Sequence, residues 1–324
     1  MVQGGPIVQV AVIAATILGL WVGARALVDA VVRLARRFGV AELTIGLTVV
    51  AMGTSTPELV VTTDAALAGL GDIAVGNVVG SNVYNLAFIL GTVSLLRVIP
   101  VERSLVHRDG AALVLSTLLA FAVLFDRTVT RPEGLLLALA FLAYTAYLLY
   151  DERTGASIET EYPASHRSGA DRTAFRGRDA LLLVGGLAVV LVSGHFMVEA
   201  ASALARSAGV SDWVIGGTIV AAGTSTPEFA VSLVAMRQGH VGMSVGNIVG
   251  SNVFNALGIM GLAAGLRPLA VSGAAIETTL WLTAVTVLMV AALWSGRRLS
   301  RVEGALFACS EALRWVLGLF RVFG

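Results

Sequence analysis

The sequence predicts an all-α membrane protein with ten transmembrane helices, arranged as two inverted five-helix repeats. Three observations predict it. Of the 324 residues, 56% are apolar and only 13% are charged, whereas a soluble globular protein has about 25% charged residues. Ten apolar segments follow one another along the chain, and the second half repeats the first at an offset of 170 residues. The composition excludes an ordinary soluble enzyme, and a net charge of only +1 gives no reason to expect a nucleic-acid partner.

Each predicted span has the length that a bilayer requires. A crossing helix needs about 20 mostly apolar residues. Short polar breaks separate segments of about this length at 7–30, 41–68, 73–96, 109–126, 133–150, 179–204, 213–236, 241–265, 274–294 and 303–323. The last segment contains Glu303, Glu311 and Arg314, so an amphipathic helix at the membrane surface is an alternative there. Its counterpart in the first half, 133–150, favours a crossing helix.

The distribution of arginine predicts the orientation. No basic residue precedes the first apolar segment, and several arginines follow it, which is the reverse of a signal peptide. If the N-terminus lies outside, 15 arginines fall on cytoplasmic loops and four on the opposite side, as the positive-inside rule requires. We therefore expect a multi-pass protein of the cell membrane with both termini outside and a cytoplasmic central loop.

The internal repeat predicts the domain organisation. Residues 45–91 align with residues 215–261 without a gap, and 25 of the 47 positions are identical. A unit of five spans ends on the side opposite to its start, so the second copy enters the membrane inverted, as in many secondary transporters. The expected division is a first repeat at 1–150, a cytoplasmic linker at 151–178 and a second repeat at 179–324.

The same six residues, Gly-Thr-Ser-Thr-Pro-Glu, occupy the middle of the second and seventh spans, at 53–58 and 223–228. Proline cannot donate the helical hydrogen bond and clashes with the carbonyl four residues earlier. Backbone carbonyls near positions 53 and 54, and again near 223 and 224, should therefore be freed. At this depth such groups are tolerated only inside the protein or beside a polar cavity, where a cation can be their partner.

A glutamate follows each of these prolines, at Glu58 and Glu228. A carboxylate at the centre of a bilayer costs about 2.5 kcal/mol or more, and inversion brings the two equivalent positions together. Two carboxylates with carbonyls and hydroxyls form an all-oxygen site of charge −2, which suits Ca²⁺. Mg²⁺ requires stricter octahedral geometry, and softer metals favour histidine or cysteine, which this region lacks. We expect no cofactor besides the transported ions.

The third and eighth spans carry a second paired motif, Gly-Asn-x-x-Gly-Ser-Asn, which begins at Gly76 and at Gly246. Ser81 and Asn85 are four residues apart, as are Ser251 and Asn255, so each pair is expected on one helix face. Asn77 and Asn247 extend these faces by one turn. For Asn77, Asn82, Asn247 and Asn252, an interhelical hydrogen bond and an ion contact both remain open.

The paired motifs resemble those of the cation/calcium exchanger superfamily, in particular the prokaryotic members of its sodium/calcium exchanger branch. By that resemblance Glu58 and Glu228, with the carbonyls of Thr54 and Thr224, hold Ca²⁺. The resemblance also implies two flanking Na⁺ sites, one formed by Ser55, Glu58, Ser81, Ala221 and Thr224, the other by Ala51, Thr54, Ser225, Glu228 and Ser251. It further implies alternating access, in which the first and sixth spans slide against the other eight.

Asn255 departs from the best-known exchangers of this family, which carry aspartate at the corresponding position. The centre then has a charge of −2, which one Ca²⁺, two Na⁺ or two protons would neutralise. We expect Ca²⁺/Na⁺ exchange, because the serine-built flanking sites are intact and protons would not need them. A Ca²⁺/H⁺ or Li⁺-tolerant antiporter that uses the same two glutamates is the alternative.

Two other classes of protein are less consistent with the sequence. A cation channel would use the same ligands but conduct passively. An intramembrane hydrolase would need a nucleophile with a general base, and the paired motifs supply no base. We therefore expect a transporter that is not an enzyme, that acts as a monomer, and whose partners are Ca²⁺, Na⁺ and the lipid bilayer.

Overall fold

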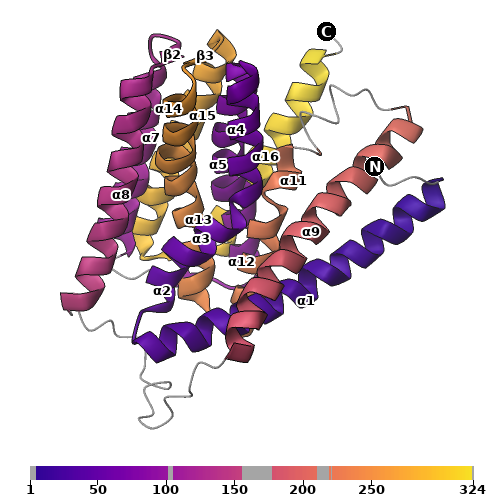
Figure 1. Cartoon of the computed structure of the whole chain (residues 1–324), viewed down its shortest axis with the longest axis vertical. Coiled ribbons are helices and arrows are strands. Elements are labelled where there is room, and N and C mark those ends of the chain that lie inside the picture. The colour runs from indigo at the N-terminus through magenta and orange to yellow at the C-terminus, as the bar shows by residue number, and fades with distance from the viewer. Residues whose placement is uncertain (1–4, 101–104, 155–176, 210–218, 220, 323–324) are drawn as a thin grey trace.

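The computed structural model describes residues 5–100, 105–154, 177–209, 219 and 221–322, and almost all of them are helical (Figure 1). The elements of the first half are α1 (Pro6–Phe38), α2 (Glu42–Ile45), η1 (Gly46–Val50), α3 (Ala51–Thr54), α4 (Thr56–Ala68), α5 (Gly71–Val83), η2 (Tyr84–Leu90), α6 (Gly91–Leu96), β1 (Ile99–Pro100), η3 (Leu105–Asp109), α7 (Gly110–Leu124), β2 (Thr128–Val129) and α8 (Arg131–Thr154).

The second half contains α9 (Gly177–Ser207), α11 (Ala221–Thr224), α12 (Thr226–Gln238), α13 (Val241–Val253), η5 (Phe254–Ile259), α14 (Met260–Leu266), β3 (Leu269–Ala270), α15 (Gly273–Gly296), β4 (Arg298–Leu299) and α16 (Arg301–Val322). From α3 onward, every element of the first half except η3 has a counterpart in this series, and most counterparts begin 170 residues later. The η segments are π-helical turns, which have a wider hydrogen-bonding pattern than an α-helix.

Seven of the described helices are long and apolar enough to cross a membrane, and the bent pair α2–α3 and α4 adds an eighth if it counts as one span. The helix α16 is not among them. Residues 213–218 and 220 of the expected seventh span lie outside the described residues, as do residues 155–176 of the expected linker. The total of ten spans therefore stays a prediction, while a membrane protein with several apolar helices is confirmed.

Two short β-ribbons connect the halves, and each consists of one strand from the first half and one strand from the second half. The strand β1 pairs antiparallel with β4, with Ile99 opposite Leu299. The strand β2 pairs antiparallel with β3, with Val129 opposite Leu269. At the offset of 170 residues, Ile99 corresponds to Leu269 and Val129 corresponds to Leu299. The two ribbons are therefore equivalent when the two halves are exchanged.

The helices α1 and α9 form a long pair on one flank of the molecule, where they lie side by side (Figure 1). Arg33, near the end of α1, bonds to Asp179, near the start of α9, while Gly23 approaches the Gly186 carbonyl. Because the contacts occur in opposite order along the two helices, the pair is antiparallel. A helix of 33 residues is about 50 Å long, which is longer than the ~30 Å hydrocarbon core of a bilayer.

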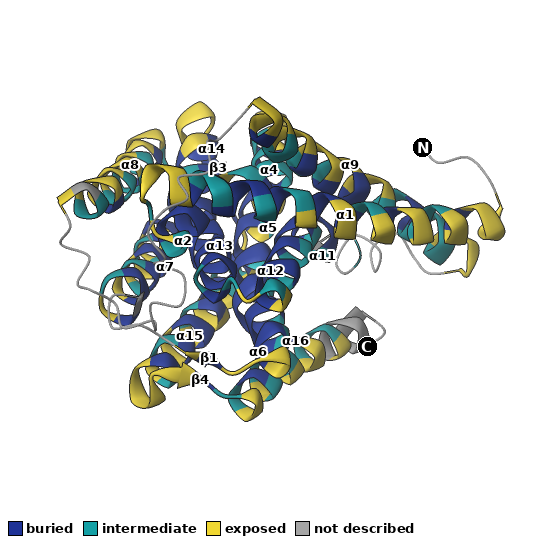
Figure 2. Ribbon diagram, turned by 90° about the horizontal axis from the view of Figure 1, so that it is seen from below, coloured by how far each residue is buried: buried dark blue, intermediate teal, exposed yellow. Residues whose placement is uncertain are grey.

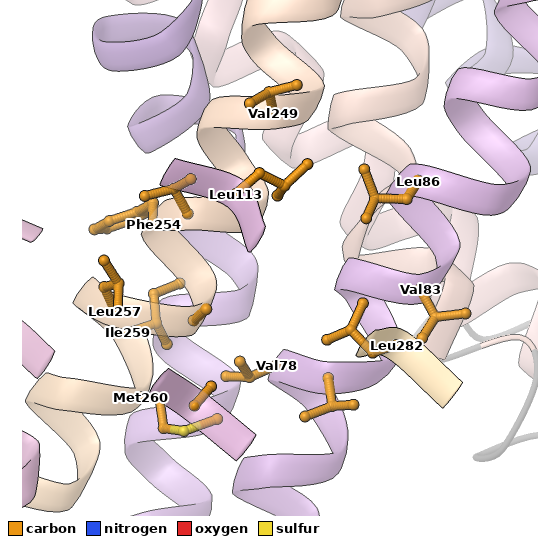
Figure 3. Close-up of a cluster of buried hydrophobic side chains, with 14 of the residues drawn as sticks. Val78, Val83, Leu86, Leu113, Val249, Phe254, Leu257, Ile259, Met260 and Leu282 are labelled. Carbon is orange, nitrogen blue, oxygen red and sulfur yellow. The ribbon is translucent and has the colours of Figure 1, made fainter. Parts of the chain in front are cut away.

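The remaining helices surround a buried centre. Figure 2 shows that the buried residues gather along α5, α12 and α13, while the exposed residues lie on the outer helices. Apolar side chains from both halves pack together there, including Val78, Leu86 and Leu113 from the first half and Ile259 and Leu282 from the second (Figure 3). This apolar packing fixes the positions of the polar residues that lie among these helices.

Candidate functional site

Two broken helices form the site. The chain leaves the helical conformation at Ser55, between α3 and α4, and again at Ser225, between α11 and α12. The first break bends the span by 49°. Pro57 and Pro227 lie in the first turn of the following helix, where the missing N–H would have no helical partner in any case. The predicted interruption is therefore present in both halves.

One of the carbonyls that we expected to be free has a partner. The Thr56 hydroxyl donates to the Gly53 carbonyl at 2.7 Å, and this carbonyl is the acceptor that Pro57 cannot serve. The Gly53 carbonyl therefore lacks its helical donor as expected, but its partner in the structure is a neighbouring hydroxyl rather than a cation. The corresponding hydroxyl of Thr226 lies 3.4 Å from the Ala222 carbonyl.

Glu58 and Glu228 are both fully buried, and each receives a hydrogen bond from the broken helix of the other half. The Ser225 hydroxyl donates to Oε1 of Glu58 at 2.9 Å, and the Ser55 hydroxyl donates to Oε1 of Glu228 at 2.8 Å. Oε2 of each glutamate is buried and has no hydrogen-bond partner in the described part of the chain. Exchange of the two halves reproduces this arrangement.

Two further groups of predicted residues lie beside the glutamates. The Ser81 hydroxyl is 3.4 Å from Oε1 of Glu58 and 3.5 Å from the Thr224 hydroxyl. On the other side, the Ser251 hydroxyl donates to the Ala51 carbonyl at 3.4 Å, and the Thr54 hydroxyl oxygen lies 3.4 Å from the same carbonyl. The structure thus brings Ser81 and Thr224 of the first set close to Glu58, and Ser251 close to Ala51 and Thr54 of the second set. Ser55 and Ser225, in contrast, bond to the glutamate of the opposite set.

Asn85 and Asn255 lie at equivalent places in the π-helical segments η2 and η5, and both are fully buried. Both amide atoms of Asn85, and Oδ1 of Asn255, have no hydrogen-bond partner among the described residues. The sequence predicted regular α-helix at both positions. The π turns, which are frequent at functional sites, begin one residue before each asparagine and carry no recognisable sequence signal.

Asn77 and Asn247 support the backbone of the glutamates. Nδ2 of Asn77 lies 3.3 Å from the Glu58 carbonyl, and Nδ2 of Asn247 lies 3.4 Å from the Glu228 carbonyl. Asn247 also accepts a hydrogen bond from the Thr54 hydroxyl at 3.1 Å. These contacts are interhelical hydrogen bonds, which was one of the two interpretations that the sequence left open.

The electrostatics of the site depend on the two glutamates. Among the described residues, neither glutamate forms an ion pair with arginine or histidine, and no group of three or more His, Cys, Asp or Glu side chains converges there. Two buried carboxylates without a cationic side chain are costly in a medium of low dielectric constant. Surrounded by hydroxyl, amide and carbonyl oxygens, they suit a hard cation.

Comparisons with known proteins identify the family to which the chain belongs. Residues 8–150 and 179–310 match the family model described as "Sodium/calcium exchanger protein". The chain is 36% identical over 280 residues to the putative antiporter CaxA of Alkalimonas amylolytica, covering 84% of this chain and 86% of the relative. It is 30% identical to the sodium/calcium exchanger MaX1 of Methanosarcina acetivorans, covering 84% of this chain and 87% of the relative.

The fold is also similar to a solved structure. The sodium-calcium exchanger NCX_Mj, soaked with Na⁺ and Sr²⁺, superposes with a TM-score of 0.81 at 26% identity, over 95% of this chain and 98% of that chain. With Na⁺ and Ca²⁺ the TM-score is again 0.81. A family of exchangers is a family of transporters and not of enzymes. Because the family match covers most of both halves, this chain belongs to the sodium/calcium exchanger protein family.

Proposed function

We propose that the chain exchanges Ca²⁺ for Na⁺ across the membrane, and that Glu58 and Glu228 are the two anionic ligands of one central cation site. The observation that carries the proposal is the pair of glutamate oxygens, one from each half, that are buried without a hydrogen-bond partner among the described residues. A buried oxygen with negative charge and no donor needs a cation. One Ca²⁺ neutralises both carboxylates.

The neighbouring oxygens complete a site for calcium. Ca²⁺ takes about six to eight oxygen ligands in flexible geometry. The carbonyls of Thr54 and Thr224 and the side-chain oxygens of Asn85 and Asn255 are the further ligands that we assign to it. The site then consists of oxygen atoms alone, and the chain needs no bound cofactor.

Shared ligands make the exchange obligatory in this proposal. Ser55, Ser81, Ala221 and Thr224 form one Na⁺ site with Glu58, and Ala51, Thr54, Ser225 and Ser251 form the other with Glu228. A serine hydroxyl that donates its hydrogen to a carboxylate keeps lone pairs for a cation. The crossed bonds from Ser55 and Ser225 therefore link each Na⁺ site to the glutamate of the other. Na⁺ and Ca²⁺ compete for the same carboxylates and exclude each other.

The transport cycle follows from the position of the site. The ligands come from the bundle, whereas α1 and α9 contact it from one flank. We propose that this pair moves against the other helices and exposes the fixed site to each side in turn. We propose that the protein acts as a monomer, since one chain supplies every ligand that we assign to the site.

The proposed topology consists of ten spans in two inverted repeats, 1–150 and 179–324, joined by a cytoplasmic linker at 151–178, with both termini outside. The antiparallel packing of α1 and α9 and the exchange of the two ribbons support the inversion. The chain has a single cysteine, Cys309. In a Cys309→Ser background, a cysteine placed within 155–176 should react with a membrane-impermeant maleimide only from the cytoplasmic side of the membrane. Labelling from the outside would contradict this topology.

A second candidate is Ca²⁺/H⁺ exchange at the same two glutamates. The observation that favours it is the amide at position 255, which leaves the site with two carboxylates that two protons neutralise as completely as two Na⁺ ions. In that case the serine hydroxyls keep their bonds to the carboxylates and bind no ion. Li⁺ in place of Na⁺ would need the same flanking oxygens and is a variant of the first proposal.

The decisive experiment is ⁴⁵Ca²⁺ uptake into proteoliposomes under separate ion gradients. An outward Na⁺ gradient at equal pH should drive uptake, and an outward proton gradient without Na⁺ should not. The double variant Glu58→Gln/Glu228→Gln should abolish uptake. Asp64→Asn, on the exposed face of the same helix as Glu58, makes the same chemical change away from the site and should transport normally. Uptake driven by the proton gradient alone would show that H⁺, and not Na⁺, is the coupling ion. Uptake that needs only a Ca²⁺ gradient would indicate a channel.

A further inference from the structure

We infer that Asn82 is a positioning residue that turns the side-chain oxygen of Asn255 toward the bound cation. Asn82 lies in α5 and Asn255 in η5, and they are 1% and 0% exposed. The inference deepens the proposed function and rests on it, because it assumes that Asn255 is a cation ligand. Asn82 itself lies outside the ligand set assigned above.

The orientation of Asn82 is set by a group whose chemistry is unambiguous. Nδ2 of Asn82 donates to the backbone carbonyl of Asn252 at 3.0 Å. A backbone carbonyl only accepts hydrogen bonds, so the amide nitrogen of Asn82 must face α13. The side-chain oxygen of Asn82 must then face the other way.

This orientation determines that of Asn255. Nδ2 of Asn255 donates to Oδ1 of Asn82 at 3.0 Å. With the nitrogen of Asn255 engaged in this bond, its Oδ1 points elsewhere, and this atom is buried without a hydrogen-bond partner among the described residues. Ser251, four residues earlier in the same span, bonds to the Ala51 carbonyl in the proposed site. The chain of two hydrogen bonds therefore presents an oxygen, and not an NH₂ group, to the cation.

The equivalent chain is missing in the other half. Asn252 is the counterpart of Asn82, but its Nδ2 donates to the Ile248 carbonyl of its own helix at 2.7 Å. Asn85, the counterpart of Asn255, has no hydrogen-bond partner at either amide atom among the described residues. The amide of Asn255 is thus held in one orientation, whereas no hydrogen bond holds that of Asn85.

A carboxylate at position 255 would need no such orientation. Aspartate has two oxygens, so either rotation of the group presents an oxygen to the cation. Its acceptor-only oxygens would also face Oδ1 of Asn82 without a hydrogen between them. The role assigned to Asn82 therefore depends on an amide at position 255 and disappears when that residue is aspartate.

The test is equilibrium binding of ⁴⁵Ca²⁺ to the purified full-length protein in detergent. Asn82→Ala should weaken Ca²⁺ binding by about fivefold to tenfold, the equivalent of one hydrogen bond. Asn252→Ala removes an equally buried asparagine whose amide nitrogen bonds within its own helix, and it is the matched control with a smaller expected effect. In an Asn255→Ala background, Asn82→Ala should cause no further loss.

The Asn255→Asp background gives a readout that a general packing role would not produce. There, Asn82→Ala should bind Ca²⁺ at least as tightly as Asn255→Asp alone, because it also removes the acceptor that faces the aspartate. If Asn82→Ala is unfolded in a thermal scan, Asn82→Leu, which fills a similar volume, replaces it. Unchanged Ca²⁺ affinity in Asn82→Ala, or an equal loss in all three backgrounds, would overturn the inference. A wild-type protein that binds no Ca²⁺ would instead overturn the proposed function.

Discussion

The two halves make matching contacts at the glutamates and different contacts at the rim of the bundle, by which we mean the packing of α8 on η5 and of α16 on η2. At the centre, Ser225 and Ser55 bond to the opposite glutamates at 2.9 and 2.8 Å. At the rim, α8 packs on η5 with Phe141 beside Phe254, whose ring centroids are 5.0 Å apart. The counterpart of Phe141 in α16 is Glu311, which is 1% exposed and ion-paired with Arg314.

The difference shows which contacts are constrained by the proposed cargo. A single cation between two carboxylates contacts both halves at once, so equivalent ligands must lie at equivalent distances. The rim only has to fill space and satisfy its polar groups. A pair of aromatic rings in one half and a buried ion pair in the other are two solutions to that problem, and replacing a buried ion pair by apolar side chains is often tolerated.

The strongest test of the comparison is the equality of the two glutamates. Glu58→Gln and Glu228→Gln should each weaken Ca²⁺ binding by about a hundredfold or more, because each leaves a divalent ion with one carboxylate in a buried site. The two losses, measured by ⁴⁵Ca²⁺ binding, should agree within about threefold, or less than 1 kcal/mol. A large difference between them would mean that the halves are not equivalent at the centre.

The interpretation of the rim contacts as packing is tested by replacing residues of α16 with those at the equivalent positions of α8. Arg314→Tyr alone leaves Glu311 buried without its cation and should lower the free energy of unfolding by about 3 kcal/mol, the lower end of the range for such losses, because Arg314 is 36% exposed. The double change Glu311→Phe/Arg314→Tyr restores the pattern of Phe141 and Tyr144 and should unfold no earlier than the wild type. Both are measured by thermal unfolding in detergent.

The double variant also separates packing from transport. If it folds and still exchanges Ca²⁺ for Na⁺, the ion pair of α16 is structural. Loss of transport in a folded double variant would assign the ion pair a role in the cycle and contradict the interpretation of the rim as packing.

The crossed serines should have smaller and equal effects. Ser55→Ala and Ser225→Ala each remove one hydrogen bond to a carboxylate and one hydroxyl ligand from a proposed Na⁺ site. Each should raise the Na⁺ concentration that half-displaces bound ⁴⁵Ca²⁺ by about tenfold. If Ser55→Ala and Ser225→Ala leave this concentration unchanged while Ca²⁺ still binds, the flanking sites do not hold Na⁺, which favours proton coupling.

The smallest expected difference is between Asn77 and Asn247, the two asparagines that bond to the backbone carbonyls of the glutamates. Asn247 is fully buried, whereas its counterpart Asn77 is half-buried. Asn247→Ala should therefore destabilise the protein by about 1 kcal/mol more than Asn77→Ala, because a buried polar partner left without its hydrogen bond costs more than one that water can reach. Equal melting temperatures for the two variants would show that the difference in burial contributes nothing.

Much of this architecture could be predicted from the sequence. The helix breaks lie next to Pro57 and Pro227 as predicted, because a missing N–H is a local property of the chain. The limits of most spans agree with the apolar segments within a few residues, since the bilayer imposes their length. The repeat also predicted contact between the halves at the glutamates, and each glutamate accepts a hydrogen bond from a serine of the other half.

Other features depend on tertiary contacts and could not be predicted from the sequence. Ser55 was grouped with Glu58, three residues away, but it bonds to Glu228, because α3 contacts α12 of the other half. The π turns at Asn85 and Asn255 share no proline or glycine signature, because the counterpart of Gly258 in η5 is Phe88 in η2. The four strands are only two residues long, too short for an alternating pattern. The orientation of Asn255 depends on Asn82, which is 173 residues away in the chain.

The reciprocal ribbons have a consequence for biogenesis. The ribbon of Val129 and Leu269 encloses a shorter stretch of chain than the ribbon of Ile99 and Leu299, and the first stretch is nested within the second. During synthesis the inner ribbon can close first, and the outer ribbon closes only after residue 299 has left the ribosome. The strand at Ile99 is therefore made 200 codons before its partner Leu299, and a message truncated between codons 271 and 297 would yield a product that can form the inner ribbon but not the outer one.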